Sequence, residues 1–201
     1  EKAAPPDNFT ARMVTMGIGM PMAKMGEKSR FENPMLSGIV TISSAGSGKV
    51  IMMSTTGRAY FEQARKEEAP SIYDPDVVIE KTKTGSETID GHSCVKYDVV
   101  MYRKDKPDEK YRGRAWEAGD LGGLTIRHEM DVPEKEGMAG GVMVMELKDV
   151  KLGAATADMF TVPEDYRKVN SMMELMAGAG GAPAMPDVEK MKEMMKNLQT
   201  E

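Results

Sequence analysis

The chain has 201 residues and a net charge of −5, and its Lys and Arg residues are interspersed among Asp and Glu, so it offers no basic stripe for nucleic acid or an anionic bilayer. This length suits one domain with a substantial core. Methionine dominates the apolar composition, with 21 Met against four Phe and one Trp, and flexible thioether side chains favour a binding role over catalysis because they adapt to irregular apolar partners.

The N-terminal residues 1–8 are polar and contain Pro5 and Pro6, so we expect a flexible leader. The chain begins at Glu1 without an initiator Met, which is typical of a mature chain that has lost a targeting segment. No stretch reaches the roughly 18 consecutive apolar residues that would span a bilayer. Any membrane attachment is therefore expected upstream of Glu1.

From Phe9 to about Thr161, short segments rich in Val, Ile, Thr, Tyr and Met are separated by Gly, Pro and Asp. This spacing predicts an antiparallel meander. The first two strands are expected to pair across Gly19, Met20 and Pro21, and a further turn is expected over 105–108. The predicted strands cover residues 9–18, 22–32, 38–44, 49–55, 58–62, 77–84, 92–103, 111–117, 124–131 and 141–150.

The strand predicted over 92–103 has the clearest pattern in the chain. The Asp90-Gly91 pair before it is a strong hairpin signal. Within the strand, apolar and aromatic residues alternate with polar ones, which is typical of a strand with one buried face. The alternating residues are Val95, Tyr97, Val99 and Met101.

Helical spacing replaces the strand pattern at Val169. Residues 169–176 and 188–198 are predicted helices, and the second carries Met191 and Met195 on one apolar stripe. The Gly, Ala and Pro linker between them, 177–186, has few side chains that could pack. We therefore expect a Met-rich helical tail over 169–201 that can close the open side of the sheet or move aside.

Three sequence blocks together resemble a bacterial group of envelope proteins of unknown function, which is similar in turn to the lipoprotein-localisation factors LolA and LolB. The blocks cover residues 85–97, which contain the Asp90-Gly91 turn, residues 116–122, which begin at Trp116, and residues 160–163, which end in Val162-Pro163. The resemblance covers roughly 9–168. It implies an open antiparallel half-barrel that holds acyl chains under short helices, in the periplasm or on a periplasm-facing outer-membrane lipoprotein.

We therefore expect a mostly β protein, a curved LolA-like antiparallel half-barrel of about nine to eleven strands with one or two helices across its concave face. The half-barrel domain would span 9–168. The expected function is non-enzymatic binding of a lipid, acyl chain or lipoprotein anchor, without a cofactor and with an outer-membrane or lipoprotein partner. The residues expected to line the hollow are Met13, Phe31, Met52, Tyr97, Val99, Met101, Trp116, Met143, Met145, Met191 and Met195.

Two other functions are compatible with the sequence. Three clustered thioethers, Met20, Met22 and Met25, could bind Cu(I) without a thiolate, which would make the protein a soft-metal carrier. A structural envelope protein could instead dock its tail helix on a partner. Cys94 and His92 lie two apart on one predicted strand, but nothing nearby supplies an orienting acid and an oxyanion site, so we interpret Cys94 as a small buried thiol.

Overall fold

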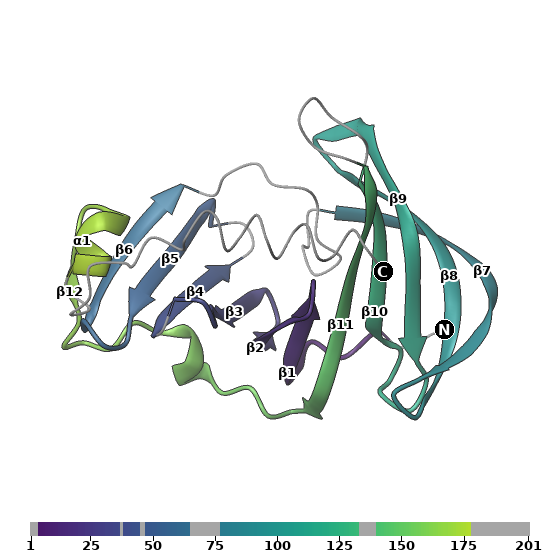
Figure 1. The fold of residues 1–201 in the computed structure, drawn as a ribbon, viewed down its shortest axis with the longest axis horizontal. Coiled ribbons are helices and arrows are strands. Elements are labelled where there is room, and N and C mark those ends of the chain that lie inside the picture. Colours follow the sequence, from purple (N-terminus) through teal and green to yellow (C-terminus); the bar gives the residue numbers. More distant parts are fainter. Residues whose placement is uncertain (1–3, 37, 45–46, 65–76, 133–139, 178–201) are drawn as a thin grey trace.

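The computed structural model describes residues 4–36, 38–44, 47–64, 77–132 and 140–177. These residues form one twelve-stranded sheet, a short α-helix and a 3-10 helix (Figure 1). The strands are β1 (Asn8–Thr15), β2 (Ile18–Met25), β3 (Lys28–Glu32), β4 (Ile39–Ser44), β5 (Lys49–Ser54), β6 (Ala59–Ala64), β7 (Val77–Ile89), β8 (His92–Arg103), β9 (Lys106–Ala118), β10 (Leu124–Val132), β11 (Gly141–Leu152) and β12 (Arg167–Lys168). The helices are η1 (Ala157–Phe160) and α1 (Met172–Ala177).

The strand order is β12-β6-β5-β4-β3-β2-β1-β11-β10-β9-β8-β7, so the sheet is open, with β12 and β7 at its edges. The chain meanders from β1 out to β6, crosses to the far edge and meanders back from β7 to β11, which pairs with β1. Neighbouring strands are antiparallel except for the parallel pair β12–β6. This confirms the predicted half-barrel, with the two-residue β12 as one strand more than expected.

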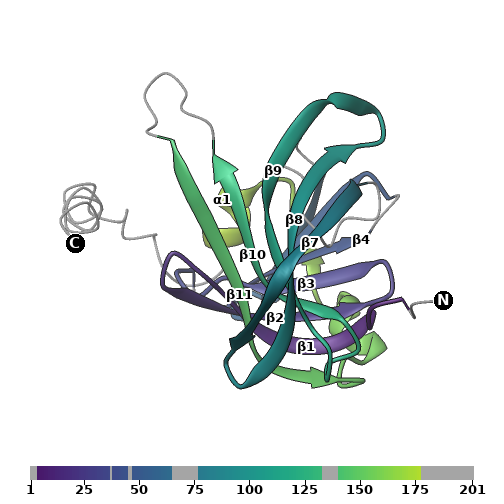
Figure 2. The same ribbon diagram turned by 90° about the vertical axis from the view of Figure 1, so that its right-hand side faces the viewer.

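The sheet has two arms that meet between β1 and β11. The strands β1 to β6 are five to eight residues long and form the short-strand arm, whereas β7 to β11 are nine to thirteen residues long and form the long-strand arm. Figure 1 shows the long-strand arm standing steeply against the short-strand arm, and Figure 2 shows it from its own side. The side on which the two arms approach each other is the concave side of the bend.

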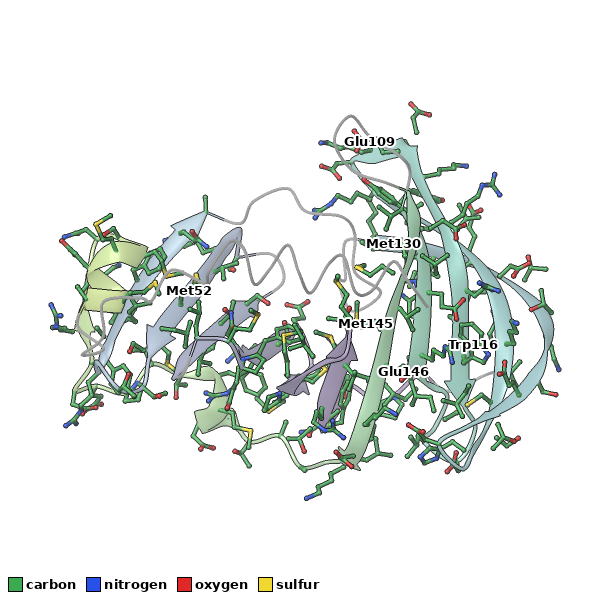
Figure 3. All side chains as sticks on the ribbon, in the orientation of Figure 1. Met52, Glu109, Trp116, Met130, Met145 and Glu146 are labelled. Atoms are coloured by element: carbon green, nitrogen blue, oxygen red, sulfur yellow. The ribbon has the colours of Figure 1, made fainter. Side chains whose placement is uncertain are left out.

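Strand register assigns the residues of each arm to two faces, because directly paired residues point to the same side of a sheet. One row runs from β6 to β1 through Phe61, Met52, Thr41, Phe31, Met22 and Ala11. Another runs from β1 to β8 through Thr15, Met145, His128, Ala115 and Tyr97. Figure 3 shows Met145 and Met130 on the side toward the short-strand arm and Glu146 on the other, so we name these the hollow face and the outer face.

The segment after β11 covers the short-strand arm on both faces. On the outer face, Phe160 of η1 packs with Val40, Ile42 and Met53. The Asn8 side chain anchors this segment through Ala155: it accepts a hydrogen bond from the Ala155 N–H at 3.0 Å and donates one to the Ala155 carbonyl at 3.1 Å. On the hollow face, Leu175 of α1 packs into a second cluster, which contains Ile39, Ala59, Phe61 and Val169. The short-strand arm thus lies between two apolar layers.

The predicted first turn was wrong. β1 and β2 are joined at Met16 and Gly17, whose φ angles of 50° and 75° suit a two-residue hairpin, and Pro21 lies inside β2 opposite Arg12. Proline is tolerated there because the β2–β3 pairing begins only at Met22, so no ladder hydrogen bond is required of Pro21. The turn predicted over 105–108 was also misplaced, since β9 begins at Lys106.

The C-terminal predictions are partly outside the described residues. A helix exists where 169–176 was expected, but it spans Met172–Ala177 and covers only the β5–β6 end of the hollow face. The second predicted helix, 188–198, and most of the linker lie outside the described residues, as do Met191 and Met195.

Candidate ligand-binding hollow

Eight of the residues expected to line the hollow lie on the hollow face. Met13, Val99 and Met101 are buried there, and Met101 is 0% exposed. The other five, which are partly exposed, are Phe31, Met52, Tyr97, Met143 and Met145. Register links these residues from β5 across β1 to β8, so apolar side chains follow the hollow face through both arms. Period-two alternation is what made this face predictable.

Trp116 differs from this group: it belongs to the same buried cluster as Phe9 and Met13, but strand register pairs it with the charged Lys96 and Arg127. Its indole N–H donates to Glu87 Oε2 at 2.8 Å, and the Lys96 Nζ and Arg127 Cζ atoms lie 5.1 and 5.0 Å from its ring centroid. Both cations are within cation–π range. Trp116 is therefore a buried anchor of the core beneath charged groups, and its predicted role as an open wall of the hollow stays a prediction.

The hollow face of the long-strand arm contains a pocket of ≈360 Å³. Its apolar walls are Phe9 of β1, Val99 and Ala115 of β8 and β9, and Leu124 of β10, and Pro5 and Pro6 close one side. This volume falls in the range of known small-molecule sites, roughly 300–1,000 Å³, which are mostly apolar with a few polar groups. The pocket is therefore large enough to accept an apolar group.

One ion pair lies among the apolar walls of this pocket. The Lys81 ammonium contacts the Glu117 carboxylate, and the Glu117 side chain is only 7% exposed. Lys81 also lies 5.5 Å from the centroid of the Tyr97 ring. A buried carboxylate is tolerated only when it is paired, so the ammonium neutralises it here. The pair adds a buried charged point to a pocket that Asp7, Lys24, Glu27 and Thr125 also line, and it could orient the polar part of a bound molecule.

His128 was not among the predicted site residues, although it lies on the hollow face between Met145 and Ala115. It is 3% exposed, and among the described residues its Nε2 atom has no hydrogen-bond partner. Burial lowers the pKa of His128 to about 4. The nearby Glu129 carboxylate raises this pKa, but its effect is smaller than that of burial. The ring is therefore neutral at pH 7. The sequence did contain a signal for this residue, because His128 takes an apolar position in the alternating pattern over 124–131.

The three methionines of the copper alternative are not brought together. Met20 and Met22 lie on the hollow face with Met13, whereas Met25 belongs to the apolar cluster of the outer face with Phe160. The reason is strand parity, because residues 20 and 22 point to one side of β2 and residue 25 points to the other. The predicted three-sulfur site is therefore not assembled.

Cys94 and His92 do share a face, but their environments differ. Cys94 is 1% exposed, and burial raises the pKa of its thiol, so it is protonated and inert at neutral pH. His92 Nδ1 lies 2.7 Å from Asp120 Oδ2 in a more open position, where this hydrogen bond lowers the pKa of Asp120. The thiol lacks the exposed, electropositive setting of a nucleophile, which agrees with our interpretation of a buried structural cysteine.

The outer face of the long-strand arm is covered by ion pairs. Glu129, which is buried, accepts from Arg114 at 2.6 Å and Arg127 at 2.7 Å, and Arg127 also contacts Glu146 at 3.4 Å. A groove of ≈490 Å³ on the outer face of β1–β3 is charged too, but its Arg12 and Arg30 are paired with Asp149 and Glu32. The outer face thus resembles an ordinary solvated surface, which leaves the hollow face as the candidate site.

None of the helices among the described residues is long and apolar enough to cross a bilayer. The sequence matches no known family model. A search of curated proteins also finds no match.

Comparison with solved structures shows a known fold. An uncharacterized conserved protein from Thermus thermophilus is similar at 11% identity with a TM-score of 0.50, over 82% of this chain and 90% of that one. At this identity the likeness shows the fold alone.

Two structures with weaker likeness carry names that agree with the resemblance found in the sequence. One is a putative outer membrane lipoprotein-sorting protein domain from Vibrio parahaemolyticus, with 9% identity and a TM-score of 0.40 over 78% of this chain and 89% of that one. The other is a LolA superfamily protein from Nitrosomonas europaea, with 11% identity and a TM-score of 0.37 over 80% and 90%. With TM-scores this low, neither likeness carries an argument about function.

Proposed function

We propose that this protein binds a hydrophobic ligand, an acyl chain, lipid or lipoprotein anchor, on its hollow face without catalysing a reaction. The observation that carries the proposal is the line of partly exposed Met, Phe and Tyr side chains that follows this face through both arms to the ≈360 Å³ pocket. Flexible thioethers suit apolar guests of varying shape. We place the protein in the bacterial cell envelope, facing the periplasm, on the strength of the sequence resemblance.

The contrast between the two faces supports this proposal. Glu146 and its neighbours on the outer face are paired charges, whereas Met143 and Met145 of the same strand are partly exposed without a charged partner. Exposed apolar side chains that form a continuous surface are typical of binding sites. The Lys81–Glu117 pair would then lie beside the polar end of a ligand in the pocket.

Extraction provides the first test. Protein purified without detergent is extracted with organic solvent, and the extract is analysed by mass spectrometry. We expect a copurified lipid or fatty acid. Uptake of a fluorescent fatty acid by the same protein measures the affinity, and a chain ending at Ala177 tests whether the tail competes for the hollow. Absence of any bound lipid together with no uptake by either chain would refute the proposal.

A matched pair of variants on one strand sharpens the test. Met143→Lys places a charge on the hollow face, and Val142→Lys places the same charge on the outer face, where Val142 is 50% exposed. An ammonium group buried beside an acyl chain is costly, so Met143→Lys should weaken fatty-acid uptake roughly tenfold or more while Val142→Lys leaves it unchanged. Equal effects of the two variants would place the ligand elsewhere.

A further inference from the structure

His128 Nε2 is a buried polar atom that the proposed hydrophobic site does not use. A buried nitrogen without a hydrogen bond costs about 1–3 kcal/mol, so a native structure that keeps one requires an explanation. The side chain lies on the hollow face, where Met143 and Met145 remain partly open to an incoming species. An occupant that bonds this nitrogen from the hollow would supply the missing partner.

Three thioether side chains neighbour His128 in the strand register. Met145 lies directly opposite it on β11, Met130 is two residues further along β10 on the same face, and Met143 lies opposite Met130. Directly paired residues have Cβ atoms about 4.5–5.5 Å apart, and diagonal neighbours about 7–8 Å, within reach of long side chains. Figure 3 shows Met130 and Met145 projecting to the same side of their strands.

The neighbouring strand β9 presents only small residues beside this group. Ala115 lies opposite His128, and Gly113 lies opposite Met130, so no large side chain of β9 occupies the adjoining positions of the hollow face. The nearest carboxylate in the sequence, Glu129, points to the outer face, where Arg114 and Arg127 hold it. The four side chains therefore offer one nitrogen and three sulfur atoms without a hard anionic ligand.

We propose that His128, Met130, Met143 and Met145 form a site for one soft monovalent metal ion, Cu(I) or Ag(I), held by the imidazole nitrogen and two or three thioether sulfurs. Thioethers select soft ions, and imidazole is compatible with them. Harder divalent ions are disfavoured, because within the described ranges no three His, Cys, Asp or Glu side chains gather to hold a metal.

This site differs from the thioether cluster of the N-terminal strands and does not depend on the lipid-binding proposal. Met20 and Met22 lie on β2, two strands away from β11, and Met25 lies on the outer face. The ligand set predicted here is also different, because it includes a nitrogen. Nitrogen coordination is what separates the proposed site from adventitious binding by exposed methionines such as Met16.

Anaerobic titration of the full chain with Cu(I) against a competing chelator, and with Ag(I) by calorimetry, tests the proposal. We expect one ion per chain, and X-ray absorption of the Cu(I) form should show both nitrogen and sulfur ligands. Met145→Leu and His128→Gln should each weaken binding roughly tenfold or more. The triple variant Met20→Leu, Met22→Leu, Met25→Leu and the variant Cys94→Ser should bind like the parent chain.

Folding of the variants is controlled in two ways. Met145→Leu conserves side-chain volume and should cost less than about 1.5 kcal/mol, so its loss of affinity is not a loss of fold. In the parent chain labelled at the methionine methyl carbons, Ag(I) should shift the signals of Met130, Met143 and Met145 and leave that of Met53 in place. Absence of stoichiometric binding, coordination by sulfur alone, or affinity untouched by Met145→Leu would each overturn the proposal.

Discussion

The short-strand arm and the long-strand arm cover their apolar surfaces in different ways. The short-strand arm is covered on both faces by one later segment, through Phe160 on the outer face and Leu175 on the hollow face. The long-strand arm has the Lys96 ammonium over the Trp116 ring and an ion pair between Arg114 and Glu129, while its hollow face retains a pocket beside Val99 and Ala115. An open apolar surface thus remains where the described part of the chain does not cover the sheet.

The largest expected effect comes from the close contact between β9 and β10 in the long-strand arm. A Cβ at Gly113 would overlap the Glu129 carbonyl oxygen, which is backbone and cannot move aside cheaply. We expect Gly113→Ala to lower the free energy of unfolding by about 3 kcal/mol or more, measured by urea denaturation with Trp116 fluorescence. Gly85→Ala is the matched control, because no atom lies near its Cβ position, and it should change stability by less than about 0.5 kcal/mol.

A comparable effect is expected when the cover of the short-strand arm is weakened. Leu175 is 0% exposed, so Leu175→Ala should cost about 3 kcal/mol through the lost burial and the cavity left behind. Met173→Ala, at a residue that is 82% exposed on the same helix, should cost less than about 0.5 kcal/mol.

The same denaturation experiment compares the two arms. Trp116 is the sole tryptophan and reports on the long-strand arm, whereas far-UV circular dichroism reports on both. Because β1 is hydrogen-bonded to both β2 and β11, we expect the fluorescence and dichroism signals to change at the same urea concentration. A dichroism change that precedes the fluorescence change in Leu175→Ala would show that the arms unfold separately.

The pH dependence of stability should arise largely on the hollow face of the long-strand arm. The pKa of His128 falls from 6.5 to about 4 on folding, so between these values the unfolded chain binds more protons than the folded one. Stability that is fully present above pH 6.5 should therefore decline as the pH falls toward 4, by up to about 3 kcal/mol. Urea titrations at several pH values measure this slope, which His128→Gln should flatten.

The smallest expected effect is on the outer face. Glu87→Ala removes the acceptor of the Trp116 indole N–H and should cost about 1 kcal/mol. Glu109→Ala, which removes only an exposed contact of 3.9 Å with Lys106, is the control and should be nearly neutral. If the two variants behave alike, the indole hydrogen bond contributes little to the long-strand arm.

Local patterns made much of the fold predictable. The strand predicted over 92–103 was confirmed at both ends, because Asp90 and Gly91 adopt the positive φ angles that a two-residue hairpin requires. The shared face of Met13, Phe31, Met143 and Met145 followed from alternation alone. Their role in binding stays a prediction, as does that of Met191 and Met195.

Other features depend on contacts that no local pattern encodes. Met16 carries positive φ in a turn that its side chain does not favour, so the stronger signal at Gly19–Pro21 misled the assignment. Trp116 is a large aromatic residue that a local pattern assigns to an apolar wall, yet Lys96 and Arg127 of the neighbouring strands lie over its ring. The pairing of Lys81 with Glu117 joins β7 to β9, and its partners could be known only from the register of three strands.

β1 is the first strand to be synthesised, but it lies in the middle of the sheet. Met13 of β1 pairs with Leu147, which is synthesised much later. Phe160 and Leu175, which cover the two faces of the short-strand arm, are later still. The apolar surfaces of the first strands therefore stay exposed until the last described segment has been synthesised. Pairings between strands this distant in sequence slow folding and prolong the exposure of apolar surface in folding intermediates. A newly made chain therefore exposes apolar strand surfaces for longer than a helical protein of equal size does, which raises its risk of aggregation before the sheet is complete.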